Sequence, residues 1–359
     1  MEKILQINTV PIKRNGMTAV ILNYSKFMDK TDLQIDFAAI NEIENGLKNE
    51  FEAIGKIHVL PMRNKNPLAY ILKLSKIIRE EKYDAVHAHG NSCTLAVDLF
   101  AAKLGGAKKR IAHSHNTKCE HNFVHRILRL PFNSLYTLGL ACSEQAGKWL
   151  FKSKSFKTLQ NAIDLAQYKF NSETRKEFRK KLNLQNKTAI VHIATLTAQK
   201  NHKFILEVLK AVLAENENYI LFLIGDGELK NDIANRIKEL QLENNAVFVG
   251  SVGNVSDYLQ AMDLAVLPSY YEGSPITIIE TQVSGLQTLV SNNVPNAGQF
   301  SDLAKMLPLK KEYWIREILE FNPAIDREKV SEYAEGYFKS AELDIRKVAN
   351  ELRKLYENG

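Results

Sequence analysis

The chain has 359 residues, of which 45% are hydrophobic and 25% are charged. This composition is typical of a folded globular protein, excludes a disordered or collagen-like chain, and is long enough for two α/β domains. The net charge of +7 at pH 7 suggests an acidic partner: nucleic acid, an anionic membrane surface or a phosphorylated ligand. A lysine-rich surface that only keeps the protein soluble explains the charge equally well.

The cysteines and the apolar segments bear on the cellular compartment. Cys93, Cys119 and Cys142 have no metal-ligand spacing, and their odd number argues against a disulfide framework. The first ten residues, MEKILQINTV, lack the apolar core of a signal peptide, and no later run reaches about 18 consecutive apolar residues. We therefore expect a protein of the reducing cytoplasm that does not span a membrane.

Strand-like apolar runs alternate with amphipathic helical segments in the first half of the chain. The expected strands are 3–10, 33–40, 56–61, 85–90, 110–116 and 138–143. One expected helix covers residues 67–82, where apolar residues recur at intervals of three and four. Strands that alternate with helices in this way predict an α/β fold with a doubly wound parallel sheet.

A polar stretch at residues 167–187 interrupts this alternation of strands and helices, and a second alternating series then begins. Its expected strands are 188–196, 219–227, 246–250, 264–269 and 286–291, with helices that start at His202 and Glu228. We therefore expect two Rossmann-like halves with a hinge near residues 161–164, and the cleft between them as the ligand site. The expected domains are 1–162, 163–335 and a C-terminal helical segment, 336–359, which can pack back on the N-terminal domain.

The segment YYEGSPITIIE contains conflicting structural signals. Its four β-branched residues in a row favour a strand. The flanks favour a helix, because Ser274 is a good N-cap, Pro275 suits a first helical turn and Gly285 is a plausible terminator. If the flanks decide, Glu272 lies in the loop before a helix and Glu280 lies inside that helix.

The longer segment LAVLPSYYEGSPITIIETQVSGLQTLVS resembles the E-x7-E signature of retaining glycosyltransferases of family 4. The strand that ends in Pro-Ser, the Tyr-Glu-Gly turn, the two glutamates and the Ser-Gly-Leu ending occur in the family's order. Related segments include NGMTAV, VHAHG, RIAHSHNT, ACSEQAGKWL, LQNAID, QKNH and IGDGEL. The resemblance implies the GT-B fold, in which two Rossmann-like domains face each other, and it is nearest to the enzymes of capsule and exopolysaccharide synthesis.

The resemblance also implies donor contacts around the two glutamates. Glu280 would accept hydrogen bonds from both ribose hydroxyls of a nucleotide sugar, and Glu272 from hydroxyls of the transferred sugar. The N–H groups that open the helix would face phosphate or sugar oxygens. The residues implied there are Gly273, Ser274, Pro275 and Ile276. Without the resemblance, Glu280 reads as a surface helix residue and Glu272 as a turn residue.

The turn HIATLTAQKNH is where the family usually offers an arginine and a lysine to the diphosphate. Lys200 is in place, but Thr195 stands where the arginine is expected, and Lys13 or Arg14 is a candidate replacement. A surface lysine at the start of a helix is the alternative interpretation of Lys200. The chain has no two aspartates separated by one residue, so we expect no metal and no cofactor, with charge supplied by side chains and helix ends.

The loop RNGMTAV follows the first strand, as the family's glycine-rich diphosphate loop does. Gly16 is its one glycine, and Asn15 takes the place of another. Asparagine tolerates positive φ, so we expect the turn to be preserved. The later IGDGEL is only a fragment of a dinucleotide-binding motif and supports that function poorly.

Histidines end two of the expected strands: His87 and His89 in the first, His113 and His115 in the second. The i, i+2 spacing places each pair on one face of its strand. Metal ligation is conceivable, but no carboxylate or cysteine lies at supporting spacing. The resemblance implies that His115 contacts the donor sugar near the reacting centre, with His113 as its nearest rival.

Two basic segments have alternative interpretations. Residues 119–139 mix apolar residues with histidine and arginine, which suits either an anionic membrane surface or ordinary core packing. Residues 174–184 are strongly basic but have only Phe178 for base stacking, so a solvated helix face is favoured over a nucleic-acid patch.

Together these observations predict a metal-independent glycosyltransferase of surface polysaccharide synthesis. It is expected to move a hexose or N-acetylhexosamine from a nucleoside diphosphate sugar, in the first place a UDP-sugar, to a lipid-linked or growing glycan. The expected location is the cytoplasm, with the inner face of the cell membrane as an option. A UDP-sugar 2-epimerase of the same architecture is the alternative enzyme. No nucleic-acid partner is expected, because paired glutamates would repel phosphates.

Overall fold

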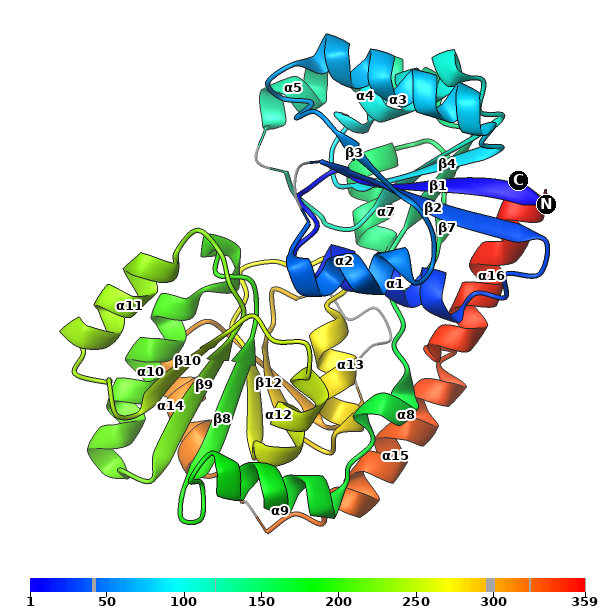
Figure 1. Ribbon diagram of the computed structural model, residues 1–359. Helices are drawn as coiled ribbons and strands as arrows, with labels where there is room; N and C mark the ends of the chain where they lie inside the picture. Colours follow the sequence, from blue (N-terminus) through cyan, green and yellow to red (C-terminus); the bar gives the residue numbers. More distant parts are fainter. Residues whose placement is uncertain (41–42, 120, 295–300, 323, 359) are drawn as a thin grey trace. The chain divides into compact units, whose positions relative to one another are not determined.

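The computed structural model in Figure 1 describes residues 1–40, 43–119, 121–294, 301–322 and 324–358. The chain forms two compact units. Unit 1 comprises Met1–Ala162 and Ile345–Gly359, and unit 2 comprises Ile163–Asp344. Each unit holds one parallel sheet with helices on its faces, so the predicted α/β class with doubly wound sheets is confirmed.

Unit 1 is built on a parallel sheet in the order β3-β2-β1-β4-β5-β6-β7. Its strands are β1 (Glu2–Asn8), β2 (Leu33–Ile40), β3 (Ile57–Leu60), β4 (Ala85–Gly90), β5 (Lys109–Ser114), β6 (Leu138–Ala141) and β7 (Lys157–Thr158). The central strands are buried on both faces, as the apolar runs predict. On β1, Leu5 and Ile7 join one core while Gln6 points to the opposite face.

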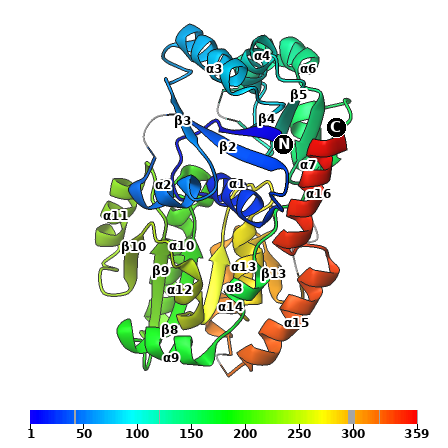
Figure 2. The same ribbon diagram turned by 45° about the vertical axis from the view of Figure 1, so that its right-hand side comes forward.

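Two groups of helices cover the sheet of unit 1. The helices are α1 (Gly16–Phe27), α2 (Asn45–Glu52), α3 (Pro67–Glu81), α4 (Leu95–Gly105), α5 (Asn122–Ile127), α6 (Arg129–Leu135), α7 (Glu144–Phe151) and α16 (Ile345–Asn358). The core on one face takes side chains from α3, α4, α6 and α7. Helix α16 packs beside α1, and Figure 2 shows it returning along unit 1. Its apolar residues Val348, Leu352 and Tyr356 recur every four positions and are buried.

Unit 2 has a parallel sheet in the order β10-β9-β8-β11-β12-β13. Its strands are β8 (Thr188–Ile193), β9 (Tyr219–Ile224), β10 (Ala246–Gly250), β11 (Leu264–Leu267), β12 (Gln287–Ser291) and β13 (Ala304–Leu307). The chain leaves β8 toward β9 on one side and later returns to β11 on the other. The carboxyl ends of β8 and β11 therefore form the topological switch point, where α/β sheets usually bind ligands.

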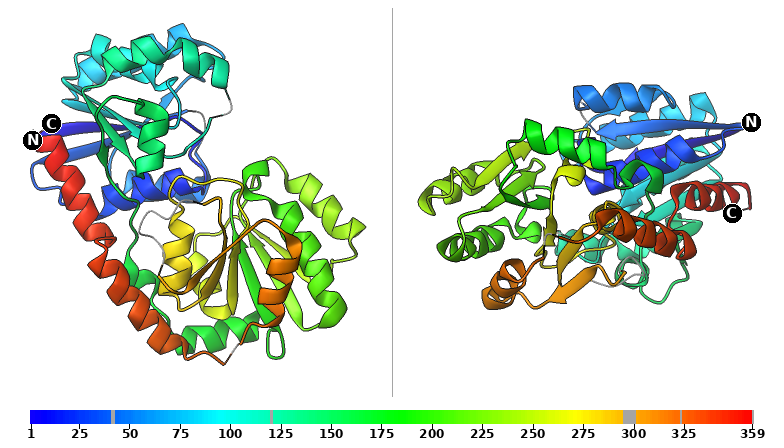
Figure 3. Two further views of the ribbon diagram at one scale, coloured as in Figure 1. Left: turned by 180° about the vertical axis from the view of Figure 1, so that it is seen from behind. Right: turned by 90° about the horizontal axis from the view of Figure 1, so that it is seen from below.

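The helices of unit 2 also lie on two faces. They are α8 (Leu165–Tyr168), α9 (Ser172–Lys181), the 3-10 turn η1 (Ala198–Lys200), α10 (His202–Glu215), α11 (Lys230–Glu239), α12 (Val255–Ala261), α13 (Ile276–Val283), α14 (Lys311–Leu319) and α15 (Arg327–Ser340). One core takes side chains from α10, α11 and α14, and Figure 3 shows these helices from behind and from below. A second core lies under α12 on the other face.

The helices of both units are short. The longest described helix, α3, has 15 residues, whereas about 20 apolar residues are needed to cross a bilayer. Within the described ranges, no helix has both the length and the apolar character that a membrane span requires.

The arginines of the basic helix α9 contact other parts of unit 2. Arg175 and Arg179 form ion pairs with the buried Asp263, at 2.6 and 2.9 Å, and both also donate to backbone carbonyls near the end of α12. Lys176 pairs with Glu173 of the same helix. These contacts attach α9 to the end of α12 and to the residue that precedes β11.

The β-branched run that follows Glu272 forms helix α13, so the flanking signals outweigh strand propensity. The predicted cap is off by one residue, because Pro275 occupies the N-cap position with φ −73° and no side chain caps the helix. The predicted terminator is confirmed: Gly285 has φ +71°. A Cβ atom at Gly285 would lie 2.5 Å from the carbonyl oxygen of Arg327, so this close approach also requires glycine.

The C-terminal part is helical, as expected, and it is divided into α15 and α16 at residues 341–344, where Glu342 adopts φ 63°. Residue 336, the expected start of the last segment, lies inside α15 and belongs to unit 2, whereas unit 1 resumes at Ile345. Strand β13 was not expected from the sequence, since AKML is short and partly exposed.

Candidate functional site

Two loops meet at the switch point of unit 2. The turn after β8 carries Thr195 and Lys200, and the loop after β11 carries Glu272. Because β8 and β11 are adjacent and parallel, their carboxyl ends bring these loops together. The backbone N–H of Tyr270 donates to the carbonyl oxygen of Gln199, at 2.9 Å, which ties one loop to the other.

Lys200 and Glu272 form an ion pair at this point. The Nζ of Lys200 lies 2.5 Å from the Oε1 of Glu272, and the two side chains are 19% and 6% exposed. The Nε2 of Gln199 donates to the other carboxylate oxygen, at 3.1 Å, and to the carbonyl oxygen of Tyr271, at 2.7 Å. Glu272 is therefore a buried, fully engaged carboxylate rather than an ordinary turn residue, and Lys200 is not a free surface lysine.

The start of α13 faces the same loop. Ser274 and Ile276 are 5% and 8% exposed, and Gly273 and Pro275 are buried with them. The N-cap residue Pro275 has no side chain that accepts from the first turn, and the N–H groups and the positive end of a helix dipole suit an anion. The loop thus presents a lysine, a carboxylate and a helix start.

Glu280 lies within α13 and is almost fully buried, at 7% exposure. Its Oε1 accepts a hydrogen bond from the hydroxyl of Tyr168, at 2.9 Å. Burial raises the pKa of Glu280 to about 7, although the Tyr168 hydrogen bond acts in the opposite direction. The surface-residue interpretation of Glu280 is therefore wrong. The carboxyl group is held inside the domain and titrates near neutral pH.

Thr195 is half-buried in the turn directly after β8. This turn packs against the IGDGEL segment: the N–H of Leu196 donates to the carbonyl oxygen of Asp226, at 3.1 Å. Gly225 has φ +145°, and a Cβ atom there would lie 2.0 Å from the carbonyl oxygen of Ala194. Gly225, the first glycine of IGDGEL, is therefore needed where this segment approaches the Thr195 turn.

The first loop of unit 1 places Gly16 at the start of α1. The expectation that Asn15 uses positive φ is wrong, since its φ is −147°. Asn15 is instead the N-cap, and its side chain accepts from the N–H of Thr18, at 3.0 Å. A Cβ atom on Gly16 would meet none of the described residues within 4 Å, so no contact in that part of the chain requires glycine there.

Arg14 is not an uncommitted cation. Its guanidinium group lies 3.0 Å from Glu50 and 3.6 Å from Glu44, so its charge is already offset within unit 1. Lys13 is exposed on the same loop. Of the two candidates for the absent arginine, Lys13 therefore has the more available charge.

The four histidines of β4 and β5 form one cluster, as their spacing predicts. His87, His89 and His113 are fully buried, and His115, just beyond β5, is half-buried. Burial lowers the pKa of each ring, that of His115 to about 3. Potential ligand nitrogens of the three buried rings lie within 4.8 Å of one another. The cluster is uncharged at neutral pH.

Two residues that hydrogen-bond the glutamates of the site, Gln199 and Tyr168, were not identified from the sequence. Gln199 orients Glu272, and its position next to Lys200 in QKNH is the only sequence signal for it. Tyr168, which bonds Glu280, is separated from it by 112 residues. Its position in a polar linker gave no signal for this contact.

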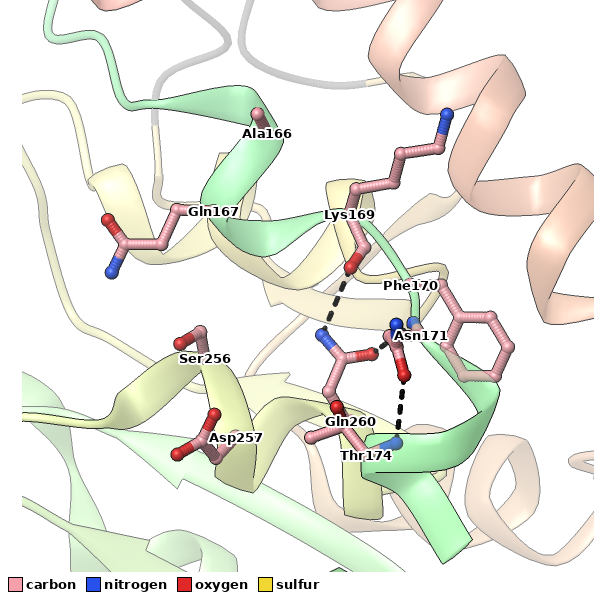
Figure 4. Close-up of a pocket in the computed structure, with 9 residues that line it drawn as sticks. All are labelled: Ala166, Gln167, Lys169, Phe170, Asn171, Thr174, Ser256, Asp257 and Gln260. Atoms are coloured by element: carbon pink, nitrogen blue, oxygen red, sulfur yellow. Dashed lines mark hydrogen bonds between the residues drawn. The ribbon is translucent and has the colours of Figure 1, made fainter.

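A pocket of about 360 Å³ in unit 2 contains none of the predicted site residues. Figure 4 shows its lining residues: Ala166, Gln167, Lys169, Phe170, Asn171, Thr174, Ser256, Asp257 and Gln260. Several of its polar groups satisfy one another. The side chain of Gln260 bridges the carbonyl oxygen of Lys169 and the N–H of Asn171, at 3.3 and 2.9 Å. We assign this crevice to the packing of α8, α9 and α12 rather than to a ligand.

Comparison with known sequences gives this geometry a family context. The sequence model described as "Glycosyl transferases group 1" matches residues 174–307. The putative glycosyltransferase EpsF of Bacillus subtilis is 29% identical over 298 residues, which is 79% of this chain and 77% of EpsF. The UDP-Gal:alpha-D-GlcNAc-diphosphoundecaprenol alpha-1,3-galactosyltransferase of Escherichia coli is 29% identical over 240 residues, which is 62% of this chain and 61% of that enzyme.

Comparison with solved structures concerns the fold. Anabaena HepE, solved in complex with UDP-glucose, matches over 100% of each chain with a TM-score of 0.81 and 17% identity. TarM matches with a TM-score of 0.78 and 13% identity. The predicted GT-B fold is thereby confirmed. Residues 174–307, which contain Lys200, Glu272 and Glu280, match the sequence model of the glycosyl transferases group 1, and the chain has the GT-B fold.

Proposed function

We propose that the protein is a retaining glycosyltransferase that moves a hexose or N-acetylhexosamine from a UDP-sugar to a lipid-linked or growing glycan in surface polysaccharide synthesis. The observation that carries the proposal is the Lys200–Glu272 ion pair beside the start of α13, with Glu280 one turn further on. All three residues lie in the group 1 domain. The name of the Escherichia coli relative specifies a UDP-linked sugar as the donor and a diphosphoundecaprenol-linked sugar as the acceptor. This name supports a UDP-sugar donor and a lipid-linked acceptor for the present protein.

Donor binding is proposed to rearrange the ion pair. In the ligand-free protein, Lys200 neutralises Glu272. A diphosphate near the start of α13 offers Lys200 a doubly charged partner, and a move toward it would free one oxygen of Glu272 for a sugar hydroxyl. Thr195 and residues Gly273–Ile276 complete the proposed donor contacts. Glu280 accepts from the ribose hydroxyls once it is ionised.

The proposed transfer breaks the bond between the anomeric carbon and the diphosphate oxygen and forms a bond from that carbon to the acceptor oxygen on the same face. The acceptor proton passes to the departing phosphate oxygen. Lys200 and the helix start stabilise the negative charge that develops on the diphosphate. In unit 1, His115 is proposed to contact the donor sugar and Gly16 the diphosphate. No metal takes part in this proposal.

A thermal-shift panel tests the donor class. UDP, GDP, ADP, NAD and common nucleotide sugars are compared, with Glu280→Ala measured alongside. A rise in melting temperature with UDP and UDP-sugars, lost in the variant, supports the proposal, because a ligand that binds only the folded state stabilises it. No shift with any nucleotide would contradict it. Consumption of the UDP-sugar without an acceptor and with a new sugar epimer would favour the 2-epimerase instead.

An anionic membrane surface is the proposed second partner, reached from the cytoplasmic side. In the segment 119–139, Phe123, Ile127 and Leu130 are 75%, 59% and 81% exposed, whereas Phe132 is buried. The core-packing interpretation therefore holds only for part of this segment.

The neighbouring helices carry further exposed apolar side chains and cations. Leu68 and Leu72 on α3, and Phe100 and Leu104 on α4, are exposed pairs spaced by one helical turn. α3 packs on α4, and α4 on α6. The exposed cations Lys73, Lys103 and Arg126 accompany these side chains. Apolar groups flanked by cations complement an anionic bilayer.

Co-sedimentation with vesicles tests the membrane partner. We expect the protein to bind vesicles that contain phosphatidylglycerol at low salt and to dissociate as salt rises, because the cations are screened. Phe123→Asp combined with Leu130→Asp should reduce binding severalfold, whereas the exposed Ile325→Asp of unit 2 should not. Absence of binding at every salt concentration, or a change of oligomeric state in the double variant, would contradict the proposal.

A further inference from the structure

Six side chains of unit 1 form one continuous chain of hydrogen bonds. They are Gln6 on β1, His87 and His89 on β4, His113 on β5, His115 just beyond it, and Tyr356 on α16. All are fully buried except His115. Gln6 pairs with His87 across β1 and β4, and His89 with His113 across β4 and β5, which explains why side chains from three strands share one face.

The links of this hydrogen-bonded chain have ordinary lengths. In order they are His113 Nδ1 to His87 Nε2 at 3.1 Å, His87 Nδ1 to the Tyr356 hydroxyl at 2.7 Å, that hydroxyl to Gln6 Nε2 at 2.7 Å, Gln6 Oε1 to His89 Nε2 at 2.6 Å, and His89 Nδ1 to His115 Nε2 at 2.8 Å. Every ring except the two terminal ones uses both nitrogens.

The direction of each bond follows from the number of protons. A neutral imidazole has one N–H donor and one acceptor nitrogen. Because the Gln6 oxygen can only accept, His89 must carry its proton on Nε2. The Nδ1 of His89 must then accept, so the bond to His115 is donated by the Nε2–H of His115. The other ring nitrogen of His115, Nδ1, is left with its lone pair.

The Gln6 amide turns its nitrogen toward Tyr356. The Gln6 Nε2 donates to the Tyr356 oxygen, and the Tyr356 hydroxyl is then free to donate to the Nδ1 of His87. Rotating the Gln6 amide by half a turn would reverse every bond in the chain and move the His115 proton to Nδ1. The orientation of one buried amide therefore determines which nitrogen of His115 is protonated.

A metal ion is the competing explanation of the cluster. Candidate nitrogens of His87, His89 and His113 are near one another, but the hydrogen bonds above already use both nitrogens of His87 and His89 and the Nδ1 of His113, which leaves only the Nε2 of His113 for a metal. Among the residues described here, no carboxylate bonds to these rings. A metal ion could bind these rings only by replacing the hydrogen bonds that His87 and His89 already make. Hydrogen bonding explains the same contacts with neutral groups, in keeping with the lowered pKa of each ring.

We propose that Gln6, His89 and Tyr356 are positioning residues that hold His115 as the Nε2–H tautomer, so that its Nδ1 accepts a hydrogen bond from a hydroxyl of the transferred sugar. The part of this proposal that concerns the sugar rests on the proposed function. The part that concerns the tautomer does not, and it can be measured in the ligand-free protein.

The test is a two-bond ¹H–¹⁵N correlation spectrum of the ligand-free full chain with labelled histidine, in which the His115 signals are assigned by their loss in His115→Asn. The wild type should show His115 protonated on Nε2. In Tyr356→Phe the ring still fills its site but no longer fixes Gln6, so the His115 signals should shift toward a mixture of both tautomers. Gln6→Met should have the same effect.

Tyr24→Phe is the matched control, because Tyr24 is also buried in unit 1 and donates to a backbone carbonyl, that of Gln160, at 2.9 Å. It should leave the His115 spectrum unchanged. Melting temperatures of all variants establish that they fold. An Nδ1–H tautomer or an equal mixture in the wild type, or an unchanged spectrum in both Tyr356→Phe and Gln6→Met, would overturn the proposal. One equivalent of tightly bound zinc, lost in His113→Asn, would also overturn it.

Turnover of the UDP-sugar separates the two parts of the proposal. Tyr356→Phe should lower kcat by about three- to tenfold with little change in the donor KM, since one hydrogen bond of modest strength is affected. If the spectra behave as expected and kcat is unchanged, the tautomer inference holds and the assignment of His115 to the sugar fails.

Discussion

The two units place polar groups at the carboxyl ends of their strands in opposite electrostatic states. In unit 2, Lys200 and Glu272 form an ion pair at 2.5 Å, on loops that follow β8 and β11. In unit 1, three neutral histidines lie on strands β4 and β5, and a fourth, His115, directly follows β5. A loop can reposition a charge when a ligand arrives, whereas a side chain in a strand interior keeps its partners. We infer that unit 2 responds to the donor and that unit 1 offers a fixed surface.

The largest expected effect comes from removing the charge of Lys200 in unit 2. Lys200→Met should reduce kcat/KM for the UDP-sugar by about a hundredfold, because a charge-assisted contact to the diphosphate is lost in the transition state. Lys203→Met, an exposed lysine at the start of α10, is the matched control and should retain activity. Near-normal turnover of Lys200→Met, measured by UDP release, would remove Lys200 from the site.

The second effect concerns the stability of unit 2 and the pKa of Glu280. The folded protein raises this pKa from 4.5 to about 7, so the folded state binds the proton more tightly than the unfolded state. Stability is therefore lost as pH rises from about 4.5 to 7. Glu280→Gln should be more stable than the wild type at pH 8, by at most about 3 kcal/mol, and the difference should shrink toward pH 5.

Calorimetric melting of the ligand-free protein at pH 5 and pH 8 measures this difference. Glu215→Gln, an exposed residue at the end of α10, serves as the control and should show no such pH dependence. Equal melting temperatures for the wild type and Glu280→Gln at both pH values would mean that Glu280 is ionised without penalty.

The third effect separates the contribution of Glu280 to UDP binding from its contribution to folding stability. Although Glu280→Gln is expected to stabilise the free protein, it should weaken UDP binding at pH 8 by about tenfold, because the ribose hydroxyls lose a charged acceptor. Isothermal titration calorimetry measures the affinity. A variant that is both more stable and equally good at binding UDP would show that Glu280 has no part in the ribose site.

The two units also show which features of the structure can be predicted from the sequence. The spacing of His87 with His89 and of His113 with His115 predicts one shared face, because strand geometry is local. The helix at Glu280 follows from Pro275 and Gly285, whose conformational limits outweigh β-branched propensity. In both cases, residues close together in the chain decide the structure.

The partners of these residues could not be predicted, because they are distant in the chain. Tyr356 lies 350 residues from Gln6, and its contact depends on the break that returns α16 to unit 1. Tyr168 reaches Glu280 from a polar linker. At Asn15, tolerance of positive φ was the wrong property to use, since its side chain caps α1 instead. Local patterns identify the groups, but tertiary contacts determine their charge and tautomer.

The most direct test of the central claim is an assay that follows UDP release and the anomeric configuration of the product, with a UDP-sugar panel and lipid-linked glycan acceptors. If the proposed reaction is right, UDP release from one UDP-sugar depends on the acceptor, and the sugar appears in the product with the donor's configuration. Lys200→Met should abolish most of the UDP release. Release of UDP without transfer, or a product with inverted configuration, would contradict it.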